Sequence, residues 1–225
     1  MATQLDLQEQ EQLDAIKAFW NRYGNFITWV LIAVLGAFAA WNGWNWWQRE
    51  QAIKAGAMFE ELDRAVQAGD ADKAGRVFSD LRERFPRTAF AAHGGLAAAK
   101  LQFEKGQFDA AKASLSWLAD KAIEDEVRTI ARMRLASVLA EAKQYDEALK
   151  ALDTATAAGF EALVADRRGD VLRVQGKPAE ALAAYQQAWK LMDEKMDYRR
   201  LVEAKLTTLG AAPAAAASAA AGVAR

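Results

Sequence analysis

The stretch Lys105-Gly106-Gln107-Phe108-Asp109-Ala110-Ala111 decides the fold, because altered copies of it recur along the chain. Related stretches occupy residues 68–74, 143–148 and 175–181, and each places a turn residue before acidic or small residues. Each copy ends on an alanine, and successive alanines lie 37, 37 and 33 positions apart, at Ala74, Ala111, Ala148 and Ala181. A period close to 34 with this turn chemistry indicates a repeated helical hairpin.

Small and large residues at fixed distances from these alanines support the repeat. Twelve positions earlier stand Ala99, Ala136 and Gly169, whereas Leu62 departs from the pattern in the first copy. Four positions later come large residues, namely Phe78, Leu115, Leu152 and Tyr185. Small residues let two backbones approach, and a large one fills the neighbouring gap. The pattern resembles the tetratricopeptide repeat, as does Pro86, which stands where that repeat ends its second helix.

The composition favours helix throughout, and no stretch alternates like a strand. We expect an all-α fold: a single N-terminal transmembrane helix, then a tetratricopeptide-like hairpin solenoid of about four repeats over residues 51–209. The expected helix pairs are 51–68 with 70–84, 90–105 with 108–120, 124–143 with 146–158, and 160–175 with 178–192. A final helix over 198–209 should cap the open end of the stack with Leu201, Val202, Lys205, Leu206 and Leu209.

Residues 26–47, FITWVLIAVLGAFAAWNGWNWW, carry no charge and predict a membrane span. A helix of this length rises about 33 Å, which matches a bilayer core. Tryptophans crowd its end, as membrane-interface residues do. A buried core helix is the soluble alternative. A cleaved signal peptide is the other, since Ala37-Phe38-Ala39 fits a cleavage pattern, but the preceding segment is long and acidic.

The flanks of this span do not settle its orientation, because Lys17 and Arg22 on one side balance Arg49 and Lys54 on the other. The large C-terminal mass weakly favours translocation of that side, which makes 1–25 a short cytoplasmic segment. Within it, residues 8–22 predict either a surface helix or a frayed acidic tail. The low-complexity, alanine-rich residues 210–225 predict a disordered tail.

Composition excludes several classes of function. The net charge is −1, with 29 basic and 30 acidic residues interspersed, which argues against a nucleic-acid surface. No cysteine is present, so disulfides and thiolate metal sites are excluded, although the redox compartment stays open. His93 is the only histidine, and we read it as a partly exposed helix residue.

Catalytic motifs are also scarce, so we expect no enzyme, no cofactor, no metal and no small-molecule substrate. Asp166 and Asp170 share one helix face and could do acid–base work, but Arg167, Arg168 and Arg173 are near enough to neutralise them. No glycine-rich phosphate loop, serine nucleophile motif or metal spacing is present.

If the domain binds a partner, we expect the concave face formed by the first helices of the pairs to do so, with an extended peptide or a partner helix as ligand. By register this protein-binding groove comprises Phe59, Asp63, Val66, His93, Leu96, Lys100, Phe103, Ile130, Met133, Ser137, Leu163, Asp166, Asp170 and Arg173. Several of these, including Phe59, Leu96 and Ile130, are equally well explained as packing between repeats.

The chain also resembles one family, the YfgM family, best over residues 134–190. The most distinctive piece is Val164-Ala165-Asp166 followed by Arg168-Gly169, and the early pattern of Glu11, Ala15, Lys17 and Phe19 agrees as well. The tryptophan-rich end of the span has no match in that family. The resemblance implies an ancillary subunit of the SecYEG translocon.

Such a protein would be single-pass in the bacterial inner membrane, with its N-terminus in the cytoplasm and its repeats in the periplasm. Its partners would be SecYEG and a PpiD-like membrane-anchored periplasmic chaperone, and it would help newly translocated proteins reach periplasmic chaperones. The alternative is an assembly factor for another envelope machine, such as cytochrome maturation or cell-wall synthesis.

Overall fold

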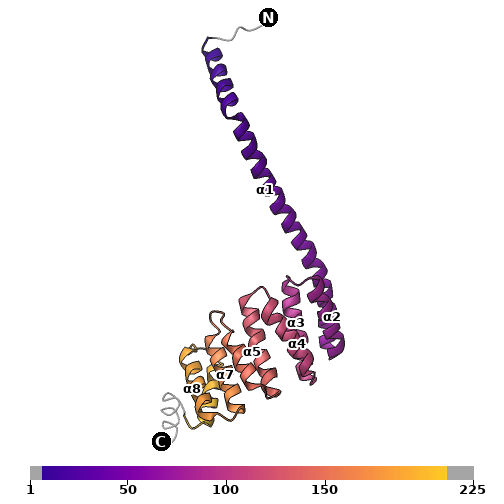
Figure 1. Ribbon diagram of the computed structural model, residues 1–225, viewed down its shortest axis with the longest axis vertical. Helices are drawn as coiled ribbons and strands as arrows, with labels where there is room; N and C mark the ends of the chain where they lie inside the picture. The colour runs from indigo at the N-terminus through magenta and orange to yellow at the C-terminus, as the bar shows by residue number, and fades with distance from the viewer. Residues whose placement is uncertain (1–6, 212–225) are drawn as a thin grey trace. The chain divides into compact units, whose positions relative to one another are not determined.

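A computed structural model of the chain describes residues 7–211, and these residues form nine α-helices and no strand (Figure 1). The helices are α1 (Leu7–Gln67), α2 (Ala71–Arg84), α3 (Ala89–Glu104), α4 (Phe108–Lys121), α5 (Asp125–Glu141), α6 (Tyr145–Asp153), α7 (Glu161–Val174), α8 (Pro178–Leu191) and α9 (Arg199–Thr208). The all-helical prediction is confirmed. The tail predicted for 210–225 lies, from residue 212 onward, outside the described residues.

The chain forms two compact units, and the boundary between them lies within helix α1, between Gln51 and Ala52. In the first unit, the residues predicted as a span expose their apolar side chains almost without exception, from Phe26 to Trp47. By length and composition, α1 is long and apolar enough to cross a membrane. Exposed apolar surface of this extent needs a nonpolar environment, which the core of a lipid bilayer supplies.

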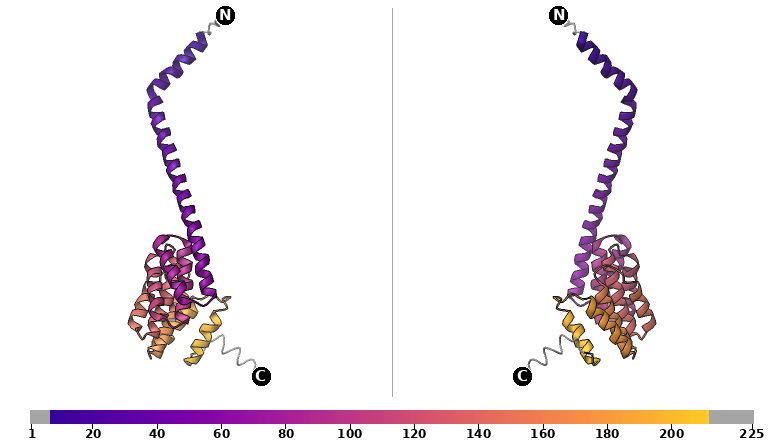
Figure 2. Two further views of the ribbon diagram at one scale, coloured as in Figure 1. Left: turned by 90° about the vertical axis from the view of Figure 1, so that its right-hand side faces the viewer. Right: turned by 90° about the vertical axis from the view of Figure 1, so that its left-hand side faces the viewer.

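The second unit is the repeat array, in which consecutive helices pack as antiparallel hairpins (Figures 1 and 2). The first hairpin is formed by the last turns of α1 with α2, and α3 with α4, α5 with α6 and α7 with α8 follow. The first helices of successive hairpins also touch, α3 with α5 and α5 with α7. The four-hairpin solenoid expected from the period is therefore present.

Close backbone approach at the small positions holds each hairpin together. Ala111, Ala136, Ala148 and Ala181 are completely buried, and Ala99 is almost so. In the fourth hairpin the approach is tightest, since a Cβ added to Gly169 would lie 2.4 Å from Tyr185 Cε1. The aromatic ring therefore lies directly against the backbone of α7, as the spacing of small and large residues predicted.

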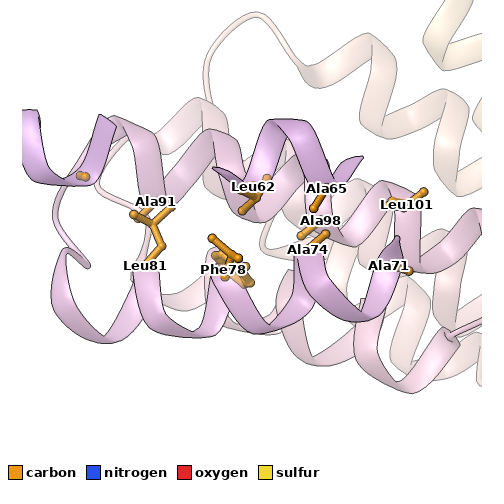
Figure 3. Close-up of a cluster of buried hydrophobic side chains, with 11 residues drawn as sticks. Leu62, Ala65, Ala71, Ala74, Phe78, Leu81, Ala91, Ala98 and Leu101 are labelled. Carbon is orange, nitrogen blue, oxygen red and sulfur yellow. The ribbon is translucent and has the colours of Figure 1, made fainter. Parts of the chain in front are cut away.

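The first hairpin reaches the same packing by a different route, which explains why Leu62 departs from the small-residue pattern. Figure 3 shows Leu62 of α1 beside Phe78 of α2 in a fully apolar cluster. The room comes from α3: a Cβ on Gly94 would lie 3.1 Å from Leu62 Cδ1, and one on Gly95 would lie 2.6 Å from Phe78 Cε2. Two glycines in the next hairpin thus replace the missing small residue.

The turns inside the hairpins share a left-handed residue, the conformation that ends a helix with a Schellman-type cap. Gly69, Gly106 and Gly176 have φ of 69°, 74° and 82°, and Lys143 adopts φ 59° in the third hairpin despite its side chain. The amide of Gln107 donates to the carbonyl of Gln102 at 2.8 Å, closing one such cap. These are the turn residues on which the repeat was recognised.

Helix α6 is the exception to the predicted bounds, because it ends at Asp153 rather than near residue 158. Thr154 Oγ1 donates to the carbonyl of Ala151 at 2.9 Å, and the amide of Ala157 donates to Thr129 Oγ1 at 3.1 Å. Arg132 of α5 also hydrogen-bonds the Thr154 carbonyl. Hydrogen bonds to the side chains of Thr129 and Arg132 in α5 therefore replace the backbone hydrogen bonds that another turn of α6 would have formed.

Helix α9 covers the end of the array as predicted, with two of its five expected residues in the core. Val202 is fully buried and Leu206 nearly so, whereas Leu201 is 48% exposed and faces away. Leu209 is partly buried against the same cluster, and Lys205 makes ion pairs that are described below.

Replacing Gly169 by alanine should test the close approach inside the fourth hairpin. We expect Gly169→Ala to lower the free energy of unfolding by about 1–3 kcal/mol through overpacking against Tyr185. Gly56→Ala is the matched control, because its new Cβ would meet Phe90 at an ordinary 3.4 Å, and helix propensity should stabilise it by about 0.5–1 kcal/mol. Thermal unfolding of the purified full-length protein in detergent measures both. Equal shifts would contradict the account.

Candidate functional site

The candidate site is a groove over the first helices of hairpins two to four. One cavity of about 460 Å³ is lined by residues of α3, α4, α5 and α7, namely Ala99, Lys100, Phe103, Leu115, Arg134, Ser137, Val138, Glu141 and Arg167. A second cavity of about 270 Å³ lies against the first and shares Ser137, Glu141 and Arg167 with it. We call the two cavities together the α3–α5–α7 groove.

Four of the predicted groove residues line these cavities. Lys100, Phe103 and Ser137 line the larger cavity, and Asp170 lines the smaller one. The ring of Phe103 packs edge-on against Phe108 of α4, with 5.4 Å between the ring centroids, so its orientation is fixed. The aromatic wall of the groove is thus held in place by the next helix.

The other predicted residues lie elsewhere. Phe59 packs at a tilt against Phe90 with ring centroids 5.6 Å apart, and Asp63 accepts a hydrogen bond from Gln67 one turn along α1. Four more predicted residues are partly buried and pack against the hydrophobic core between helices: Val66, Leu96, Met133 and Leu163. Ile130 is partly buried, and His93 and Arg173 are exposed on their helices without lining either cavity.

Sequence reasoning missed the two arginines of the groove. Arg134 and Arg167 lie 33 residues apart, each two positions before the small residue of its hairpin, so they occupy equivalent positions. Arg134 Nη1 donates to the carbonyl of Leu96 at 3.1 Å, and Arg167 Nη1 lies 3.5 Å from Asp170 Oδ2. This shared register was readable in the sequence and could have identified them.

Asp166 corrects the predicted groove, because α9 covers it and leaves it only 1% exposed. Lys205 Nζ donates to both of its carboxylate oxygens at 2.8 Å, and Tyr198 Oη donates to Oδ2 at 2.8 Å. A carboxylate so enclosed cannot contact a ligand in the groove. Its function is to dock α9 onto α7.

Asp170 joins the same buried cluster from one turn further along α7. Its Oδ1 lies 2.8 Å from Lys205 Nζ and accepts a hydrogen bond from Tyr185 Oη at 2.8 Å. Lys205 therefore neutralises the aspartate pair, with a weaker contribution from Arg167, whereas Arg168 pairs with Asp153. The nearby arginines were expected to fill this role, but a lysine 39 residues after Asp166 fills most of it.

Burial raises the pKa of both tyrosines in the cluster. It raises the pKa of Tyr185 well above its usual range, and the hydrogen bond to Asp170 adds to the effect. The pKa of Tyr198 is raised in the same way, by burial and then by its hydrogen bond to Asp166. Both hydroxyls therefore stay protonated and act as donors to the carboxylates. The paired carboxylates are thus part of a structural network.

Between residues 11 and 211, the structure holds no group of three His, Cys, Asp or Glu side chains placed to bind a metal ion. The α3–α5–α7 groove, which apolar and charged side chains line together, is the candidate ligand site.

Known proteins with similar sequences identify the family of the chain. Residues 17–211 match the family model described as a tetratricopeptide repeat-like domain. The chain is 31% identical over 204 residues to a Neisseria gonorrhoeae protein named ancillary SecYEG translocon subunit, covering 90% of this chain and 98% of that one. The chain belongs to the YfgM family. The resemblance read from residues 134–190 is thus confirmed.

Further relatives agree with this assignment. An Escherichia coli protein of the same name is 32% identical over 182 residues, covering 79% of this chain and 85% of that one. Among solved structures, tetratricopeptide-like repeats of a putative kinesin light chain from Podosopora anserina superpose with a TM-score of 0.52 at 15% identity. They cover 69% of this chain and 85% of theirs, and at that identity they confirm the solenoid fold.

Removing the lysine of the buried cluster should be strongly destabilising. Lys205→Met leaves Asp166 and Asp170 facing each other under α9 with only Arg167 nearby as a cation, which should cost about 3–5 kcal/mol. Adding Asp166→Asn to that variant should recover part of the loss, because it removes the like charge. Lys190→Met on the exposed side of α8 is the control and should be near neutral. Chemical denaturation of the full-length protein measures the free energy of unfolding of each variant. Equal losses for Lys205→Met and Lys190→Met would refute the stabilising role of the cluster.

Proposed function

We propose that this protein is a membrane-tethered interaction scaffold that associates with the SecYEG translocon. The observation that carries the proposal is the similarity, over most of both chains, to relatives named ancillary SecYEG translocon subunit. The repeat fold supports it, because solenoids of helical hairpins present long grooved surfaces to other proteins. The α3–α5–α7 groove provides such a surface here. Partner binding, rather than turnover of a small molecule, is its proposed activity.

Residues 26–47 are the proposed single span in the inner membrane, between a short cytoplasmic segment over 1–25 and a periplasmic repeat domain over 51–209. The uncharged apolar stretch supports the span, and the contrast in size between the two flanking segments supports the orientation. A tether of this kind raises the local concentration of the groove at a membrane pore without any new contact.

In this role the groove would receive newly translocated proteins and help to pass them to periplasmic chaperones, with a PpiD-like membrane-anchored chaperone as a second partner. Lys100, Phe103 and Ser137 are proposed to meet the emerging chain, because they line the larger cavity. The mixture of fixed aromatic surface and exposed charge suits segments that have not yet folded.

A photo-crosslinker at the groove tests the partner. With the crosslinking residue in place of Lys100, we expect in-cell irradiation to attach translocon subunits, emerging chains or a membrane-bound periplasmic chaperone. The same residue in place of Lys190, which is exposed on α8 and lies outside both cavities, should give much less of these products. Mass spectrometry of the products from native membranes identifies them. Attachment to another envelope complex, with no translocon component above background, would favour an assembly-factor role instead.

Because the chain has no cysteine, single-cysteine variants can report its orientation. We expect a membrane-impermeant maleimide to label Lys190→Cys in intact spheroplasts, and Gln12→Cys only after permeabilisation. Both positions are exposed, so access to the reagent depends on the membrane rather than on burial. The reverse labelling pattern would place the repeats in the cytoplasm and contradict the proposal.

A further inference from the structure

The α3–α5–α7 groove combines an apolar floor with a basic rim. Phe103 supplies the accessible apolar surface, whereas Ala99, Leu115 and Val138 back the cavity and are at most 3% exposed. The charged residues of the larger cavity are Lys100, Arg134 and Arg167 against Glu141 alone. This local excess of positive charge contrasts with the whole chain, whose net charge is −1. The groove therefore favours a ligand that is both apolar and negatively charged.

The two arginines line the same cavity, and each is held there by a contact of its own. One terminal nitrogen of Arg134 donates a hydrogen bond to the backbone carbonyl of Leu96, and this bond holds the guanidinium at the rim of the groove. The other N–H groups of the planar guanidinium can then donate to a ligand. Arg167 is 3.5 Å from Asp170, but Asp170 Oδ1 is already engaged by Lys205 and Tyr185. Asp170 therefore holds Arg167 in place at the groove and offsets part of its charge.

Lys100 is the weaker member of the rim. Its ammonium lies 3.8 Å from Glu104 one turn away, and both side chains are more than half exposed. Such a pair contributes little and gives way readily to a better partner. The guanidiniums, in contrast, can form two parallel hydrogen bonds with one carboxylate. Arg134 and Arg167 should therefore carry most of the discrimination.

We infer that the groove binds an unfolded polypeptide segment in which an aspartate or glutamate stands beside an aliphatic or aromatic residue. The carboxylate is held between Arg134 and Arg167, and the apolar side chain packs on Phe103. The inference rests on the proposed function, which it deepens by naming the chemistry of the segments received. A nucleic acid fits less well, since it needs a continuous basic stripe rather than an apolar floor.

Fluorescence anisotropy with the full-length protein in detergent micelles tests the chemistry of the ligand. The probes are three labelled twelve-residue peptides that alternate leucine with glutamate, glutamine or lysine. We expect the glutamate peptide to bind at least about tenfold more tightly than the glutamine peptide, the lysine peptide to bind weakest, and added salt to narrow the difference. Equal affinity for the glutamate and glutamine peptides would overturn the inference.

Charge reversal locates the binding. Arg134→Glu with Arg167→Glu should weaken the glutamate peptide at least about tenfold and improve the lysine peptide. Arg87→Glu is the matched control, because it makes the same kind of charge change at an exposed position outside both cavities and should leave the peptide affinities unchanged. Circular dichroism confirms that each variant is folded. An unchanged affinity in the double variant would overturn the inference.

Two further measurements separate this inference from its alternatives. A labelled twelve-nucleotide oligothymidylate that bound as tightly as the glutamate peptide, and through the same arginines, would show that the groove selects charge alone and would overturn it. Co-purification of SecYEG with wild-type protein tests the proposed function independently. Loss of peptide selectivity with the translocon retained would refute only the inference, whereas selective peptide binding without the translocon would refute only the proposed function.

Discussion

Close approach of two helix backbones at one small residue is the constraint on which the rest of the array depends. At Gly169 no side chain could be added without displacing the ring of Tyr185. In the other hairpins buried alanines fill the same role, and in the first hairpin Gly94 and Gly95 do so from the next helix. Each contact sets the distance between two helices, so their repetition positions α3, α5 and α7 side by side and creates the groove between them.

The buried charges at the C-terminal end follow from the same geometry. Once Gly169 has admitted Tyr185, the ring's hydroxyl reaches Asp170, and Lys205 of α9 joins the two aspartates from above. A buried ion pair adds little net stability compared with apolar packing, but it is costly to break. Here it fixes which face of α9 lies on the array, and Val202 then enters the core. The cap consumes the acidic face of α7 and leaves the basic rim of the groove accessible.

The sequence was sufficient for the period, the hairpins and the span, because each rests on a local pattern of small, large and turn residues. It was insufficient where residues far apart in the chain compete. The amide of Ala157 donates a hydrogen bond to the Thr129 side chain instead of to a carbonyl of α6, so the helix ends early. The sequence around residue 157 contains no local signal that predicts this end. Asp166 was placed in the groove because its register lies on the predicted concave face of the first helices, but α9 packs over it and buries it. Arg134 was readable by register and was overlooked.

The proposed membrane tether and the proposed binding groove would give the protein two properties that a free repeat domain lacks, namely a fixed place at the membrane and a surface that selects its ligands. The most direct measurement is a cryo-electron microscopy reconstruction of the protein purified with its partners from native membranes. The account predicts a complex with SecYEG in which the repeat array lies on the periplasmic side and the α3–α5–α7 groove is open or holds a polypeptide segment. An array on the cytoplasmic side, or a native complex that contains no SecYEG subunit, would contradict it.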